Sequence, residues 1–149
     1  MASRRQQILE ALRARLWAIR TTAGFATDAG ETVFLGETPE LGPDDPEQAI
    51  AMVVEDEIPT YQGENLYTTI PIVIAALAKA DLDEPWLAVE AVLGDIKAAV
   101  ELADRTLGGL VTRQIQRGPT RTMQRDAGSV TVGVAIEYRC PLVEAWGRP

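Results

Sequence analysis

The sequence predicts a two-layer α+β domain, with a mostly antiparallel or mixed β-sheet of four to five strands and two main helices packed on one face. Apolar residues recur at helical spacing in two segments, and alternating strand-like segments lie between and after them. Strands that follow one another, with a helix inserted between them, favour this layering. The length of 149 residues fits one domain, so residues 1–149 are expected to form a single unit.

The first helix is expected over residues 3–20, with Ser3 as its N-cap and Gly24 closing the segment. Its apolar stripe comprises Ile8, Leu9, Leu12, Leu16 and Ile19. The arginines on its other faces are interpreted either as a solvated surface or as contacts for an acidic neighbouring subunit.

The second helix is expected over residues 85–103, capped by Asp83 or Glu84, with Pro85 in its first turn and a Gly108-Gly109 stop beyond it. The buried stripe steps by three and four residues through Trp86, Val89, Leu93, Ile96 and Val100. Trp86 is therefore predicted to anchor the core.

Strands are expected over residues 32–35, 49–57 and 64–78, and an acidic, proline-rich loop over residues 38–47. Both faces of the 64–78 strand become apolar near its end, which is typical of a central strand covered on both sides. Pro71 cannot donate to a ladder, so a bulge or an unpaired edge is expected there.

The last pair of strands is expected over residues 110–116 and 130–139. Residues 117–128 between them are predicted to be a basic loop or arm, because they carry Arg117, Arg121 and Arg125. An arginine-rich loop is expected to bind acidic partners.

Charge is segregated along the chain. Residues 21–104 contain 18 acidic and two basic residues, whereas the flanks contain 12 arginines and four acidic residues. Complementary charge sets register and orientation across interfaces, so this split favours a protein that assembles with copies of itself or with a polar partner. The net charge of −8 argues against a dedicated nucleic-acid binder. The longest apolar run, residues 70–78, is about half the roughly 20 residues that span a bilayer, so no membrane contact is expected.

The groups that most enzymes use are scarce. The chain has no histidine and one cysteine, Cys140, which excludes the usual zinc sites and the Ser-His and Cys-His nucleophiles. No dinucleotide-binding or phosphate-loop glycine motif occurs. No catalytic residue, cofactor or metal is therefore expected. A carboxylate or metal enzyme built on Glu55, Asp56 and Glu57 is the least favoured alternative, because these residues also fit a charged strand end before Pro59.

The closing strand, Val130-Thr-Val-Gly-Val-Ala-Ile-Glu-Tyr-Arg-Cys140, resembles that of the tail terminator (tail completion) proteins of long-tailed bacteriophages, prophages and gene transfer agents. In that family the strand commonly ends in Tyr-Arg-Thr, whereas here Cys140 and Pro141 follow Arg139. The resemblance covers nearly the whole chain as element order: an N-terminal amphipathic helix, Glu-rich early strands and a long strand near Tyr67.

The resemblance implies a virion structural protein, usually a hexameric ring, that caps the tail tube, ends its polymerisation and offers a surface for head–tail joining. The implied partners are the chain itself, the major tail tube protein and the head–tail connector proteins. The implied locations are the host cytoplasm during assembly and the virion tail. The family has no catalytic residues to carry over.

Opposite charges are expected to meet across the subunits of such a ring, and a negative lumen would let DNA pass without specific binding. The interface candidates are Arg13, Arg15, Arg117, Arg121, Arg125, Asp44, Asp45, Glu55, Asp56 and Glu57. Two other functions stay open: a head–tail connector or neck adaptor protein, and a non-viral protein-interaction module.

Overall fold

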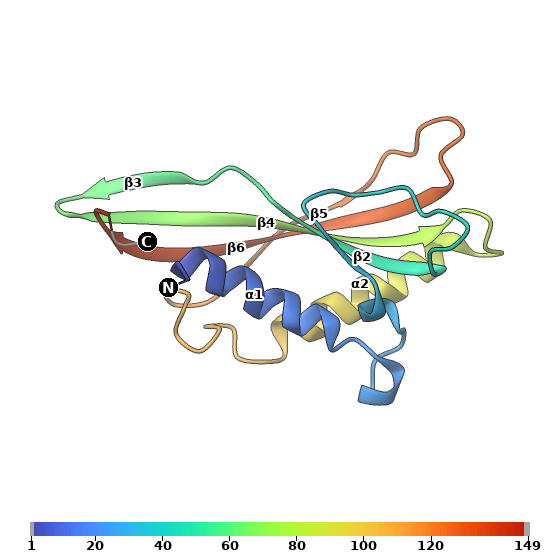
Figure 1. Ribbon diagram of the computed structural model, residues 1–149, viewed down its shortest axis with the longest axis horizontal. Helices are drawn as coiled ribbons and strands as arrows, with labels where there is room; N and C mark the ends of the chain where they lie inside the picture. Colours follow the sequence, from blue (N-terminus) through green and yellow to red (C-terminus); the bar gives the residue numbers. More distant parts are fainter. Residues whose placement is uncertain (1, 148–149) are drawn as a thin grey trace.

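A six-stranded sheet forms one layer and two α-helices form the other in residues 2–147, the part of the chain that this computed structural model describes (Figure 1). The strands are β1 (Val33–Leu35), β2 (Gln48–Val54), β3 (Ile58–Gln62), β4 (Asn65–Lys79), β5 (Gln116–Thr122) and β6 (Thr131–Ala145). The helices are α1 (Arg4–Trp17) and α2 (Pro85–Glu101). The predicted α+β class is confirmed, but the strand count of four to five was too low.

The two longest strands, β4 and β6, pair along their whole length and form the spine of the sheet. The strand order is β1-β2-β4-β6-β5, and β3 pairs with the part of β4 that β2 leaves free. The pairing of β1 with β2 is parallel and the other pairings are antiparallel, so the sheet is mixed.

The bulge or unpaired edge expected at Pro71 takes the form of a break in the strand that pairs with β4 on one side. The β2–β4 ladder ends at Val54 opposite Ile72, and the β3–β4 ladder begins at Ile58 opposite Thr69. Residues 55–57 therefore lie opposite only two residues of β4, and the Glu55 N–H donates to the Pro71 carbonyl at 2.9 Å. Because proline has no N–H, the neighbouring strand is interrupted where a ladder bond cannot form. The prediction that residues 55–57 continue the second strand was wrong: they join β2 to β3.

The main core lies between the helices and one face of the sheet. Four of the five residues of the predicted α1 stripe, Ile8, Leu12, Leu16 and Ile19, are fully buried, and Leu9 is partly buried. The helix ends at Trp17 and not at Arg20. Ser3 caps it as expected by accepting from the Gln6 N–H at 3.1 Å. Neither α-helix in residues 2–147 is long and apolar enough to cross a membrane.

Two expectations for α2 were wrong. Trp86 keeps 44% of its surface exposed, whereas the other members of the stripe are buried. Trp86 lies in the first turn of the helix, before the part that packs on the sheet begins at Val89. Glu84 occupies the N-cap position but makes no capping hydrogen bond with its side chain.

The fifth strand was also misplaced. Residues 110–113 form turns and bends, residues 114–115 are irregular, and β5 begins at Gln116, so half of the predicted 117–128 loop is strand. The apolar residues Leu107, Val111 and Ile115 are buried core contacts of a loop, not members of a strand. β5 itself is polar and mostly exposed, which is typical of an edge strand that only one neighbour pairs.

One end of the sheet extends past the N-terminal end of α1 (Figure 1). This part, called the arm below, comprises β3, the Gly63–Glu64 turn, residues 65–67 of β4, residues 143–145 of β6 and Trp146. All five residues of β3 are exposed. Gly63 has a φ of 62° at the first position of a two-residue hairpin turn, a conformation that favours glycine.

Candidate assembly surfaces

On the β5 edge of the sheet, the side chain of Arg117 is held by a carboxylate of α2. Arg117 donates to both carboxylate oxygens of Glu101 at the end of α2, at 3.0 and 2.5 Å. The buried Tyr138 of β6 donates its hydroxyl to the same carboxylate at 2.6 Å. The three side chains therefore tie β5, β6 and α2 together, and Arg117 forms its bidentate pair within its own subunit.

The ionisation of this cluster follows from its contacts. Burial acts to raise the pKa of Glu101, but the hydrogen bonds from Arg117 and Tyr138 outweigh it and lower that pKa below its usual value. Burial, and then the Glu101 carboxylate, raise the pKa of Tyr138. Glu101 is accordingly ionised and Tyr138 is the neutral donor at neutral pH.

Replacing Tyr138 with phenylalanine is expected to destabilise the fold by about 1–2 kcal/mol, because it removes a hydrogen bond to a charged group. A lowered carboxyl pKa contributes stability above the unfolded-state pKa and loses it as pH falls through the folded-state pKa. The difference in unfolding free energy between Y138F and wild type should therefore shrink as the pH falls below about 4. Urea unfolding at several pH values measures both effects; an unchanged difference at pH 3 would contradict the charged hydrogen bond.

Three other arginines predicted as interface candidates differ in the hydrogen bonds that their side chains make. Arg15 donates to the carbonyl oxygens of Val100, at 3.1 Å, and Asp104, so it satisfies the C-terminal end of α2. Arg125 donates to the Ser129 carbonyl at 2.9 and 2.7 Å and closes the loop before β6. The Arg121 side chain is exposed on β5 and has no hydrogen-bond or ion-pair partner within residues 2–147. Arg121 is thus the one of these three whose side chain makes no polar contact among the described residues.

The predicted acidic candidates lie in two places. Glu55, Asp56 and Glu57 are exposed at the break opposite Pro71, where Glu57 pairs with Arg5 of α1. Asp44 and Asp45 lie in the loop before β2, and Asp45 accepts from the Gly42 N–H at 2.7 Å. Within residues 2–147 no three Asp, Glu or Cys side chains gather in a way that could hold a metal ion.

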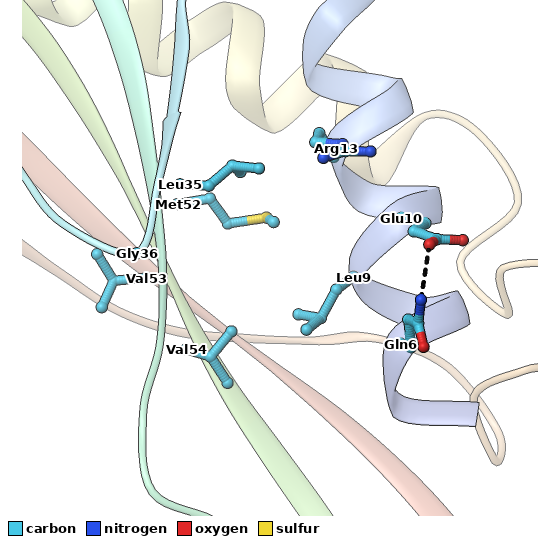
Figure 2. A pocket seen from close by; sticks show the side chains of 9 residues that line it. All are labelled: Gln6, Leu9, Glu10, Arg13, Leu35, Gly36, Met52, Val53 and Val54. Carbon is cyan, nitrogen blue, oxygen red and sulfur yellow. Dashed lines mark hydrogen bonds between the residues drawn. The ribbon is translucent and has the colours of Figure 1, made fainter. Parts of the chain in front are cut away.

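Arg13 borders a groove between α1 and the β1–β2 edge, shown in Figure 2. Leu9 from the helix and Leu35, Met52 and Val54 from the strands line its apolar floor. Gln6, Glu10 and Arg13 form its polar rim on α1, where Gln6 donates to Glu10 at 3.2 Å. The cavity volume is about 480 Å³, within the range of about 300–1,000 Å³ that is usual for binding pockets. It is called the α1 groove below.

Sequence reasoning missed the arm as an interface candidate. Tyr61 of β3 and Trp146, just after β6, stack with ring centroids 5.6 Å apart and planes 14° apart. They remain 60% and 62% exposed, so the two rings pack on each other and not on the core. Ile58, on the same strand as Tyr61, is 81% exposed. The glycine at position 63 could have indicated the hairpin turn. The contact between Tyr61 and Trp146, which lie 85 positions apart in the sequence, could not be read from it.

These features define a class of architecture: a mixed sheet with both α-helices on one face and an arm that extends beyond them. The fold is similar to that of a chain in the solved virion of a native gene transfer agent particle, with a TM-score of 0.63 and 15% sequence identity. The match covers 91% of this chain and 93% of the other. No family model matches the sequence, and no curated protein is similar to it at a significant level.

Proposed function

We propose that this protein is a virion structural protein that caps a tail tube as a ring, ends tube polymerisation and provides the surface for head–tail joining. The observation that carries the proposal is the shared fold with a chain of a gene transfer agent virion over nearly the full length of both chains. The resemblance of residues 130–140 to the closing strand of tail terminators supports the terminator role within such a particle.

Side-chain contacts, not strand pairing, join the subunits in this proposal. The exposed strands β3 and β5 contain Pro59 and Pro119, which remove donors from edges where another strand could add. A contact between two different surfaces of neighbouring copies closes into a ring when its rotation closes. The ring, a hexamer by the family resemblance, would contact the tube on one face and the connector on the other.

Charge complementarity sets the register of the ring. Arg121 is exposed without a partner among the described residues, and Asp44, Glu55 and Asp56 are exposed acids on other parts of the surface. We place Arg121 against such acids of a neighbouring subunit or of the tube. Surplus acidic residues that face the lumen would repel DNA phosphates, so DNA would pass without specific binding.

The tube-capping function is tested by co-expressing the chain with the tail tube protein from its own gene cluster and measuring tube lengths by electron microscopy. Wild type should limit tube length and leave a ring at one end. Arg121→Glu should weaken capping strongly and Arg121→Gln less, because reversal adds repulsion to a lost attraction. Thermal melting should be unchanged by either variant, since Arg121 is exposed.

Tubes of unlimited length in the presence of wild-type protein would contradict the terminator function. If the same protein instead bound the connector complex and not the tube, the neck adaptor function would replace it. Binding to neither, with wild type folded, would favour an interaction module outside the virion.

A further inference from the structure

The arm presents an apolar surface for which its own subunit provides no cover. The stacked rings of Tyr61 and Trp146 are more than half exposed, and Leu66, opposite Tyr61 on β4, is only partly buried. Exposed aromatic side chains grouped in this way mark contact sites more often than isolated ones do.

The α1 groove has the complementary character. Its floor consists of four apolar side chains, of which Leu35 is 45% exposed, and it is open along the β1–β2 edge of the sheet. An aromatic side chain that entered it would contact Leu9, Leu35 and Val54 and would remove their apolar surface from water.

The arm cannot fill the groove of its own subunit. Tyr61 lies opposite Leu66 of β4. Leu35 of the groove lies opposite Met52 of β2, which in turn lies opposite Ile74 of β4. Leu66 and Ile74 are eight residue steps apart on β4, so at about 3.3 Å per step arm and groove are separated by about 26 Å. An occupant of this kind must come from another copy of the chain.

Charge favours such an encounter. The arm segments 58–67 and 143–146 contain two charged residues, Glu64 and Glu144, and both are acidic. The helix α1 carries four arginines and one glutamate, so its net charge is positive. Arg13 and Glu10 both lie on the groove rim, and Arg5 is paired with Glu57. An acidic arm approaching a basic helix is attracted and oriented before the apolar surfaces meet.

We propose that the arm of one copy docks its Tyr61–Trp146 pair into the α1 groove of the next copy. This inference rests on the proposed ring and specifies its subunit contact. Because arm and groove are different surfaces, the contact is heterologous. Each copy offers one of each, so copies join head to tail and form a closed ring when the rotation between them closes. Glu64 and Arg13 form the polar margin of the contact.

The first test compares subunit dissociation of three variants by dilution. Tyr61→Ala and Trp146→Ala should each raise by about 30-fold or more the protein concentration at which half of the subunits dissociate. This is the effect expected when a central aromatic contact worth about 2 kcal/mol is lost. Ile58→Ala is the matched control. Ile58 is more exposed than Tyr61 on the same strand, but an odd separation of three residues places it on the opposite face. Circular dichroism should show that all three variants remain folded.

The second test links the two surfaces directly. A chain with Tyr61→Cys and Leu35→Cys, treated with a short bis-maleimide, should give a ladder of covalent oligomers up to the ring, whereas each single variant should stay monomeric on a denaturing gel. Burial raises the pKa of the native Cys140 thiol to about 12, so that thiol stays unreactive. The 26 Å separation prevents linkage within one subunit.

The outcomes separate this contact from the proposed function. Rings that persist in Y61A and W146A, or a loss of equal size in I58A, would overturn arm docking and leave tube capping intact. Rings that fall apart in Y61A and form the ladder in the double-cysteine chain, but never limit tube length, would uphold the contact and refute the capping function.

Discussion

Replacing Gly30 with alanine is expected to cost about 3 kcal/mol or more of folding free energy. A Cβ at this position would lie 2.4 Å from the Leu16 carbonyl oxygen and 2.6 Å from that of Ile19. Both oxygens are backbone atoms, one in the last turn of α1 and one just after it, so they cannot turn away as a side chain would. The Gly30 N–H also donates to the Ile19 carbonyl at 3.2 Å, which fixes the close approach. A loss of this size is a large fraction of the free energy of unfolding of a typical protein, which is about 5–15 kcal/mol.

Gly94 supplies the matched control. It lies within α2, and a Cβ there would meet no atom within 4 Å. Gly94→Ala should therefore stabilise the protein by about 0.5–1 kcal/mol, because alanine is the better helix former. Urea unfolding of G30A and G94A should give shifts of opposite sign. A G30A variant as stable as wild type would show that the end of α1 does not pack on residues 29–31 as described.

Replacing Asp95 with alanine is expected to cost about 3 kcal/mol. Its buried carboxylate accepts from the Ala26 N–H at 3.0 Å, the Thr27 N–H at 2.8 Å and the Thr27 hydroxyl at 2.7 Å. These three bonds attach the segment between α1 and β1 to the middle of α2. Truncation leaves buried donors without an acceptor, which costs more than the net value of the bonds themselves.

Two substitutions separate this mechanism from a general effect of mutating α2. Asp95→Asn keeps one acceptor oxygen and should cost about half as much. Glu90→Ala, at an exposed position on the same helix, should change stability by less than about 0.5 kcal/mol. Equal losses in D95A and E90A on urea unfolding would contradict the role of the buried carboxylate.

The helices and the spine of the sheet could be predicted from the sequence because burial imposes a period on them. Ile8, Leu12 and Leu16 repeat at helical spacing, and Val132, Val134 and Ile136 alternate, since each set faces one core. Edge strands have no such requirement. β3 and β5 contain proline and mostly polar residues, so periodicity did not reveal them.

The candidate surfaces were predicted less well, because a charge pattern does not say which charges are already paired within the subunit. Arg15 and Arg117 looked as available as Arg121, yet they bind groups at the end of α2. The arm was missed because Tyr61 and Trp146 meet only after β3, β4 and β6 have paired. Exposure of an aromatic pair is a property of the assembled sheet, and local sequence does not contain it.

The central claim is that this chain works by docking to copies of itself, and the mass of the purified wild-type particle tests it most directly. Light scattering over a wide concentration range should give one closed assembly, at a fixed whole-number multiple of the 16.2 kDa chain, that does not grow further on concentration. A particle with the mass of a single chain at every concentration would contradict the claim.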